Sequence, residues 1–224
     1  MTKYIPHVLS TYQNIKASKR TIKIHYMGSS KCIWQKRELT HPASFNTLAL
    51  DQEQKQAIID DLDRFLSRKE LYKKVGKPWK RDYLLYGTPG TGKSTLIAAM
   101  ANHLKFDVYD LELSSVCSNL DLVRALRDTL LLRLDMHIHL SFLKGKAFRI
   151  LASNYLSIEV YHPLFEQIEG LLEKIQVTHV VVAEQLIRND YSGFALEELV
   201  KFLKEIWTMK GIFRFMNGNA TQLV

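Results

Sequence analysis

The hydrophobic and polar positions in the first third of the chain predict strands followed by a helix. Residues 21–26 alternate as a strand does, and Ile33–Trp34 resembles part of another strand. Further on, apolar residues recur at helical spacing from Ala57 to Leu66, and Asp51 is placed to cap that helix. The basic connector at residues 73–78 contains Gly-Lys-Pro and is expected to break the helix.

The middle of the chain predicts a strand, a crossover helix and a second strand. Tyr83–Tyr86 is expected to be a short buried strand, residues 95–101 a helix, and residues 106–111 the second strand. A strand–helix–strand unit of this kind implies a parallel sheet, so the pattern favours an α/β fold.

From about Phe142 onward the pattern is helical. Three apolar stripes are expected to face a common core, at residues 147–156, 164–175 and 196–207. Residues 211–224 lack a convincing period and are expected to form a frayed tail.

A glycine-rich loop separates the expected strand at residues 83–86 from the helix that follows. It reads Gly87-Thr88-Pro89-Gly90-Thr91-Gly92-Lys93-Ser94, which matches the Walker A pattern G-x-x-x-x-G-K-[ST]. The glycines let backbone N–H groups approach phosphates, and the next helix adds its positive end. The residues expected to bind ATP are Gly87, Thr88, Pro89, Gly90, Thr91, Gly92, Lys93, Ser94 and Thr95, with Ser94 as the protein ligand of Mg²⁺.

Hydrolysis of ATP needs an additional acidic pair on a strand, the Walker B element, and no such pair follows four apolar residues in this chain. Leu130–Asp135 is interrupted by Arg133, and Val180–Glu184 lies inside the helical region; both are read as structural segments. Asp110 and Glu112, after the loop helix, are weak surrogates. ATP binding is therefore predicted, and turnover is doubtful.

The composition indicates a globular protein. Hydrophobic residues make up 46% and charged residues 24% of the 224 positions. Cys32 and Cys117 form neither a disulfide framework nor a metal-ligand pattern, which favours reduced thiols in an intracellular protein. The chain has no secretory signal and no apolar run of the ~18 residues that a membrane span needs, so it is expected to be soluble as written.

Positive charge is concentrated near the beginning of the chain. Residues 1–38 hold eight Lys or Arg and one acid, Glu38, while the whole chain has a net charge of +8. Such a segment is able to meet nucleic acid or anionic lipid. A solvated basic face is the favoured interpretation, and nucleic-acid binding is not expected.

The run from Trp79 to Leu113, WKRDYLLYGTPGTGKSTLIAAMANHLKFDVYDLEL, resembles the plant AAA-type ATPases related to the mitochondrial chaperone that translocates the Rieske iron–sulfur protein. Residues 41–77 resemble the lead-in to that family's ATPase core, and residues 135–142 resemble the strand that ends the core. Residues 148–156 and 162–178 resemble its helical lid. The resemblance covers nearly all of residues 4–207.

The resemblance implies an α/β P-loop NTPase (AAA) core that is incomplete, with a helical lid and a small β-containing basic segment in front. Residues 1–39 are then the basic segment of the family-specific domain, 40–141 the truncated core, 142–210 the lid and 211–224 the tail. The chain departs from the family at residues 123–128, which pass directly across the place of the Walker B and sensor segments. The family's membrane anchor has no counterpart in the sequence.

Two further departures concern single residues. Of the two arginines that close the family's core, the chain keeps Arg133, the candidate trans-acting arginine finger. His179 stands where relatives tend to have proline, a difference that we expect to matter little.

The leading hypothesis is an AAA-family ATPase subunit that binds ATP and Mg²⁺, the family activity being hydrolysis coupled to the remodelling of a protein client. The alternative is a nucleotide-binding subunit deficient in hydrolysis, or a non-functional truncated product. A small-molecule phosphotransferase would share the loop but not the lid. Partners are expected among AAA-family subunits, the client and the compartment stay open, and a membrane at mitochondria or endoplasmic reticulum is implied by the family alone.

Overall fold

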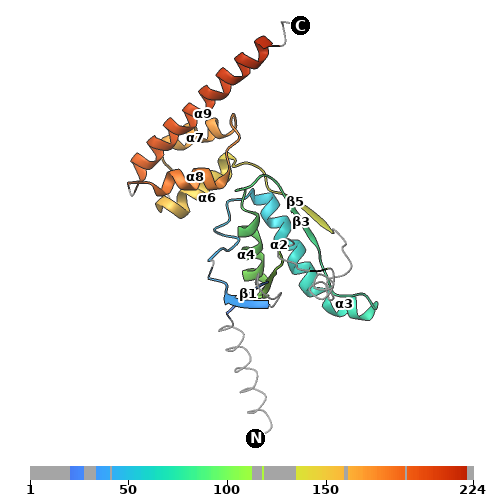
Figure 1. Ribbon diagram of the computed structural model, residues 1–224. Helices are drawn as coiled ribbons and strands as arrows, with labels where there is room; N and C mark the ends of the chain where they lie inside the picture. Colours follow the sequence, from blue (N-terminus) through green and yellow to red (C-terminus); the bar gives the residue numbers. More distant parts are fainter. Residues whose placement is uncertain are drawn as a thin grey trace. The chain divides into compact units, whose positions relative to one another are not determined.

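The computed structural model describes residues 21–27, 34–40, 42–112, 118, 135–158, 161–189 and 191–220. The helices and strands of the chain are shown in Figure 1, and its internal contacts divide it into two compact units. The first contains residues 1–44 and 97–132, and the second contains residues 45–96 and 133–224. Helix α4 (Lys93–Leu104) begins in the second unit and ends in the first.

The first unit contains a three-stranded sheet with the order β2-β1-β4. β1 (Lys23–Met27) pairs antiparallel with β2 (Trp34–Glu38) and parallel with β4 (Val108–Asp110). The His25 and Tyr109 rings stack at 4.3 Å across β1 and β4, and the N–H of Lys23 donates to Asp107 at 3.0 Å. The strands expected at residues 21–26 and 106–111 are therefore confirmed.

The second unit opens with helix α2 (Gln52–Ser67), followed by the short helix α3 (Lys69–Lys74). The Asp51 carboxylate accepts hydrogen bonds from the N–H groups of Glu53 and Gln54 at 3.0 and 3.3 Å, as an N-cap does. Ile58 and Leu62 of α2 are fully buried. The sequence predicted this helix and its cap correctly.

β3 (Tyr83–Tyr86) and β5 (Met136–His139) form a separate, two-stranded parallel sheet. The prediction that β3 is buried was wrong, because Leu84 and Tyr86 are 37% and 47% exposed. Side chains two apart point to the same face of a strand, and this face of β3 is open. The expected single sheet around α4 was also wrong, since β3 and β4 pair with different strands. The α/β class with parallel strands and a helical C-terminal region is confirmed.

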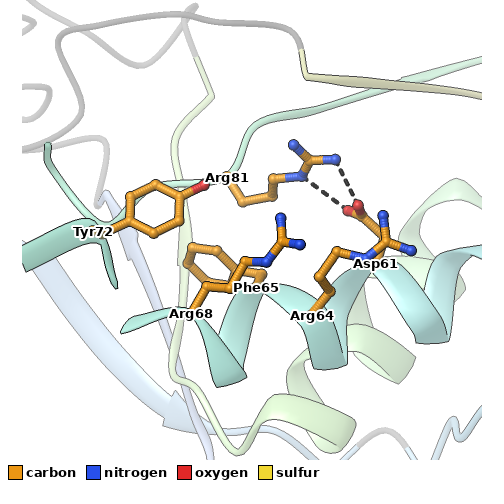
Figure 2. A pocket seen from close by; sticks show the side chains of 6 residues that line it. All are labelled: Asp61, Arg64, Phe65, Arg68, Tyr72 and Arg81. Carbon is orange, nitrogen blue, oxygen red and sulfur yellow. Dashed lines mark hydrogen bonds and ion pairs between the residues drawn. The ribbon is translucent and has the colours of Figure 1, made fainter. Parts of the chain in front are cut away.

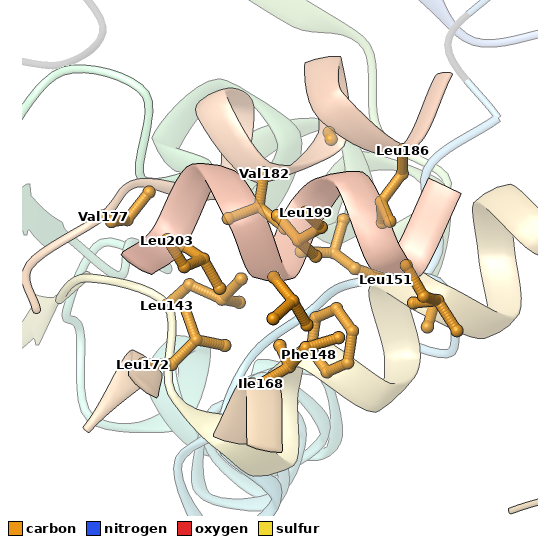
Figure 3. Close-up of a cluster of buried hydrophobic side chains, with 14 of the residues drawn as sticks. Leu143, Phe148, Leu151, Ile168, Leu172, Val177, Val182, Leu186, Leu199 and Leu203 are labelled. Carbon is orange, nitrogen blue, oxygen red and sulfur yellow. The ribbon is translucent and has the colours of Figure 1, made fainter. Parts of the chain in front are cut away.

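The lid consists of α6 (Gly145–Leu156), α7 (Leu164–Leu172), α8 (His179–Ile187) and α9 (Ser192–Ala220). Its helices surround a cluster of fully buried side chains that includes Phe148, Ile168 and Leu199 (Figure 3). α9 extends to Ala220. The prediction of a frayed tail from residue 211 was therefore wrong for residues 211–220, which are helical. A helix that is already anchored by packing adds further residues at little cost, which explains the extension.

Candidate functional site

The glycine-rich loop lies between the carboxyl end of β3 and the first turn of α4. Gly87, Gly90 and Gly92 all have positive φ, at 140°, 79° and 91°. A Cβ atom built on Gly87 would lie 2.2 Å from the carbonyl oxygen of Leu140, which directly follows β5. The N–H of Leu140 in turn donates to the carbonyl of Tyr86 at 2.9 Å. The base of the loop is thus held by β5, at a distance that only glycine tolerates.

Side chains of the loop close it on itself. Thr91 is buried, and its hydroxyl donates to the carbonyl of Thr88 at 2.9 Å. The Lys93 ammonium donates to the carbonyls of Gly87 and Thr88, at 2.9 and 2.8 Å. Ser94, on the first turn of α4, is exposed. The loop therefore presents one lysine charge, one open hydroxyl and the positive end of a 12-residue helix at the same place.

The beginning of the lid helix α8 contacts this loop within the second unit. The N–H of Val180 donates to the carbonyl of Gly90 at 3.3 Å. A Cβ atom on Gly90 would lie 3.2 Å from the Thr178 hydroxyl, so a larger residue there would push against the lid. The lid and the loop are thus in direct contact, through backbone atoms.

His179 makes a second contact between the lid and the core, which the sequence did not indicate. Its Nε2 lies 2.8 Å from the carbonyl oxygen of Ala49, so Nε2 carries the proton and donates. The other ring nitrogen, Nδ1, is buried and has no hydrogen-bond partner within the described part of the chain. Burial lowers the pKa of His179, opposed in part by the Ala49 carbonyl. Its ring is therefore held in the neutral form.

A cavity of about 360 Å³ lies beside His179, which is one of its lining residues. Its wall includes Ala49, Leu50 and Gln54 from the start of the core, and Phe142 after β5. Gln54 is fixed there, since its side-chain amide donates to the carbonyl of His139 at 2.9 Å. The lid contributes Lys144 and Glu173, which form an ion pair at 3.1 Å. This volume lies in the range of small-molecule sites.

The other candidate residues lie on other elements or outside the described residues. Arg133 and the rest of residues 130–134 lie outside the described residues. Glu184 is exposed on α8, which confirms that its segment is helical, and Asp110 ends β4 in the other unit.

The described residues contain neither a candidate metal site nor a candidate membrane span. No group of three or more His, Cys, Asp or Glu is placed there to hold a metal ion. No helix in this part of the chain has the length and apolar character required to cross a membrane.

Comparison with known proteins identifies the lid first. Residues 143–211 match a family model described as the At3g28540-like AAA+ ATPase lid domain. The chain is 39% identical to AAA-ATPase At3g50940 of Arabidopsis thaliana, over 90% of this chain and 60% of that protein. It is also 36% identical to Protein HYPER-SENSITIVITY-RELATED 4 from the same plant, over 90% of this chain and 49% of the relative. The chain thus spans three fifths or less of these relatives. Their names mention no Rieske protein, so that part of the resemblance stays a prediction.

The alignments also contain long stretches without a counterpart in this chain. The alignment with AAA-ATPase At3g50940 is 272 positions long, whereas 90% of 224 residues is about 202. The difference, 272 less 202, leaves about 70 positions at which the relative has a residue and this chain has none. These positions of the relative are therefore skipped inside the aligned region.

Proposed function

The chain belongs to the plant AAA-type ATPases, and from this premise we propose that residues 87–95 bind ATP together with Mg²⁺. We further propose that the chain turns the nucleotide over slowly or not at all. The observation that carries the binding proposal is the loop itself, with three glycines at positive φ, a lysine folded over it and a helix beginning at that lysine. This arrangement is suited to a polyphosphate.

Lys93 and Ser94 are the residues that fit the phosphates and the metal ion. The Lys93 ammonium already lies over the loop, where it bonds to two carbonyl oxygens. A phosphate oxygen is a stronger acceptor than a carbonyl, because the bond is charge-assisted on both sides. The exposed hydroxyl of Ser94 suits a magnesium ion, which prefers oxygen ligands. ATP would supply the phosphoryl group, and these side chains would bind and orient it.

The cavity beside His179 is our candidate for the nucleoside part of ATP. It has about 360 Å³, lies in the same unit as the loop, and is lined by His179, one residue from Val180, which contacts Gly90. Apolar walls from Leu50 and Phe142 and the fixed amide of Gln54 are typical of sites that bury a base and orient it.

Slow turnover follows from the residues around the loop. Hydrolysis requires a carboxylate that orients water and completes the magnesium shell. The acids that follow α4 most closely in sequence are Asp107, Asp110 and Glu112, and none of them follows the four apolar residues that precede a Walker B pair. About 70 positions of the relative have no counterpart in this chain, and the sequence has no acidic pair after four apolar residues.

Calorimetric titration with ATP and Mg²⁺ tests the binding proposal. Lys93→Ala should weaken binding by more than about tenfold, because a charge-assisted contact contributes roughly 1.5–3 kcal/mol. Lys204→Ala is the matched control, since it removes an exposed lysine from α9. Equal affinities for the parent and Lys93→Ala would refute the proposal.

A phosphate-release assay tests turnover separately. Steady ATP consumption, abolished by Lys93→Ala, would refute slow turnover while leaving the binding proposal intact. In that event Asp110, Glu112 and Glu184 become the residues to replace.

We propose that the chain forms no stable ring by itself and joins intact AAA relatives as a defective subunit. In AAA rings a neighbour's arginine stabilises charge on the γ-phosphate, and this role falls to Arg133 here. Size-exclusion chromatography with light scattering, in the presence of ATP, is the measurement. A six- or seven-subunit peak from the purified chain, or failure to co-elute with an intact relative, would contradict the proposal.

A further inference from the structure

A second concentration of positive charge lies far from the N-terminal segment, at residues 64–81. These 18 residues contain eight Lys or Arg and a single acid, Glu70. Their net charge of +7 nearly equals that of the whole chain, +8. The basic residues are Arg64, Arg68, Lys69, Lys73, Lys74, Lys77, Lys80 and Arg81. The end of α2, helix α3 and the connector to β3 therefore carry a large excess of basic residues, bordered by Asp60, Asp61, Asp63 and Asp82.

Aromatic packing fixes this surface in place. The Phe65 and Trp79 rings stack at 4.7 Å, and Tyr72 meets Phe65 edge-on at 6.3 Å. The Trp79 indole N–H also donates to the carbonyl of Phe65 at 3.0 Å. One residue each from α2, α3 and the connector thus holds the three segments together. The basic side chains of these three segments are therefore attached to a backbone whose position is fixed, which we call the platform.

A pocket of about 80 Å³ opens in this platform, lined by Asp61, Arg64, Phe65, Arg68, Tyr72 and Arg81 (Figure 2). Arg81 is already neutralised, since it donates two hydrogen bonds to Asp61 at 2.9 and 2.6 Å. Arg64 and Arg68, in contrast, form no ion pair with any residue that the structure describes, although the charge of Arg64 helps to lower the pKa of the nearby Asp61. Like charges four residues apart on a helix repel each other. The pocket therefore holds two guanidinium groups that an anion would stabilise.

Two exposed aliphatic side chains project among the lysines of the same surface. Leu71 and Val75, four residues apart on α3 and its end, are 50% and 55% exposed. Lys69, Lys73 and Lys74 flank them in sequence. Aliphatic residues set among lysines are typical of segments that lie in the headgroup region of a membrane.

We propose that α3 and the end of α2 dock on an anionic phospholipid bilayer, with Arg64 and Arg68 receiving a lipid phosphate and Leu71 and Val75 entering the headgroup region. The pocket has room for one phosphate, and its two unpaired arginines match that anion in charge. A cluster of four to eight Lys or Arg is the usual number for such surfaces.

Two features favour lipid over nucleic acid as the anionic partner. Single-stranded nucleic acid binds to aromatic rings that are open to stacking, whereas Phe65, Tyr72 and Trp79 are engaged with one another. Exposed aliphatic groups such as Leu71 and Val75 add nothing to binding along a phosphate backbone.

The docking surface is separate from the candidate nucleotide site. Arg81 precedes β3, and the Tyr83 hydroxyl at the start of the strand donates to Asp61 at 2.7 Å. The glycine-rich loop follows the opposite, carboxyl end of β3. Loss of vesicle binding and loss of ATP binding can therefore be distinguished in one set of variants.

The test is sedimentation of the full chain with vesicles of phosphatidylcholine alone or mixed with phosphatidylserine. Binding should require phosphatidylserine, and Arg64→Gln/Arg68→Gln should weaken it about 25-fold, since each basic residue at the surface contributes about 1 kcal/mol. The matched control is Lys16→Gln/Lys19→Gln, which removes the same charge from the N-terminal basic segment. The Lys16/Lys19 control should weaken vesicle binding several-fold less than the Arg64/Arg68 pair does.

A second pair of variants separates docking from general attraction of charge. Leu71→Ser/Val75→Ser keeps every charge, yet it should weaken vesicle binding at least threefold, because buried apolar area contributes to interfacial binding. Circular dichroism and ATP titration should show these variants to be folded. Equal losses from the two charge pairs, no effect of the serine pair, or binding to single-stranded RNA without binding to vesicles would each overturn the proposal.

Discussion

The lid and the two-stranded sheet β3–β5 belong to the same compact unit, yet they bury their side chains very differently. In the lid, Phe148, Ile168, Leu196 and Leu199 are completely buried, and Phe148 meets Phe165 edge-on at 5.6 Å. In β3 no residue is buried, and in β5 Ile138 alone is. A helix satisfies its own backbone and needs neighbours on one stripe, whereas a strand needs partners at both edges and cover on both faces. Among the described residues, the lid is thus packed around its own buried core, whereas β3 and β5 are largely exposed.

The comparison also explains why the glycine-rich loop is well formed beside an exposed sheet. Its shape depends on contacts within a few residues, from Thr91 and Lys93 to the carbonyls of Gly87 and Thr88. Two longer-range supports come from Leu140, after β5, and from the N–H of Val180 on α8. The conformation of the loop therefore does not depend on further strands beside β3 and β5.

The largest expected effect is on the lid. Phe148→Ala should lower the free energy of unfolding by about 3–5 kcal/mol, because it opens a cavity in a fully packed cluster. Urea denaturation followed by circular dichroism measures the change. A loss below about 1 kcal/mol would mean that the lid is not the stable part of the unit.

Next in size is the ion pair at the amino end of β3. Asp61→Asn should cost roughly 1.5–3 kcal/mol, because the carboxylate accepts from both Arg81 and Tyr83. Burial raises the pKa of Asp61, but these hydrogen bonds outweigh burial and hold it below the ordinary value of 3.8. The carboxylate's contribution is therefore present above pH 3.8 and lost as pH falls through the lower, folded pKa. A parent and variant with the same acid unfolding profile would contradict this.

His179 tests the junction between the lid and the core. His179→Ala should cost about 0.5–1.5 kcal/mol at neutral pH, the usual range for one hydrogen bond. Because burial lowers the pKa of His179, the unfolded chain binds the proton more readily, and stability should fall as pH drops below its ordinary pKa of 6.5. Thermal unfolding of parent and variant between neutral and mildly acidic pH measures this. The variant should lose less stability over that range; an equal loss would exclude His179 as the cause.

The smallest effect is expected on the open face of the sheet. Leu84→Thr should change the free energy of unfolding by less than about 0.5 kcal/mol, since the side chain is partly exposed and threonine suits a strand. The same urea titration used for Phe148→Ala provides the comparison. A loss as large as that of the lid variant would show that this face of β3 is covered in solution.

The helices could be predicted from the sequence because their signals are local. The cap at Asp51, the apolar spacing of α2 and the stripes of α6, α7 and α9 all lie within short windows. The glycine-rich loop was equally readable, because its glycines and lysine follow a fixed spacing. How these residues bind nucleotide stays a prediction.

Pairing between distant residues could not be predicted in the same way. The strands β3 and β4 were expected in one sheet because they flank α4, but their pairing depends on β5 and β1, which are far away in sequence. The contact of His179 with Ala49 likewise joins residues 130 positions apart, and no local pattern marks it. The pocket that contains Arg64 and Arg68, at the end of α2, also depends on distant residues, because Arg81 and Asp61 pair across 20 positions in its wall.

Gly87 and Lys93 stand under different selective pressures, although both belong to one motif. The carbonyl of Leu140 excludes any side chain at residue 87, so every lineage that keeps this chain folded must keep glycine there. Lys93 donates two exposed hydrogen bonds to carbonyl groups, and the loss of such bonds costs far less stability than a clash with the backbone. Natural variants with another residue at position 93 and glycine at 87 would mark a chain retained for a purpose other than ATP. Strict purifying selection at 93 would mark one still maintained to bind it.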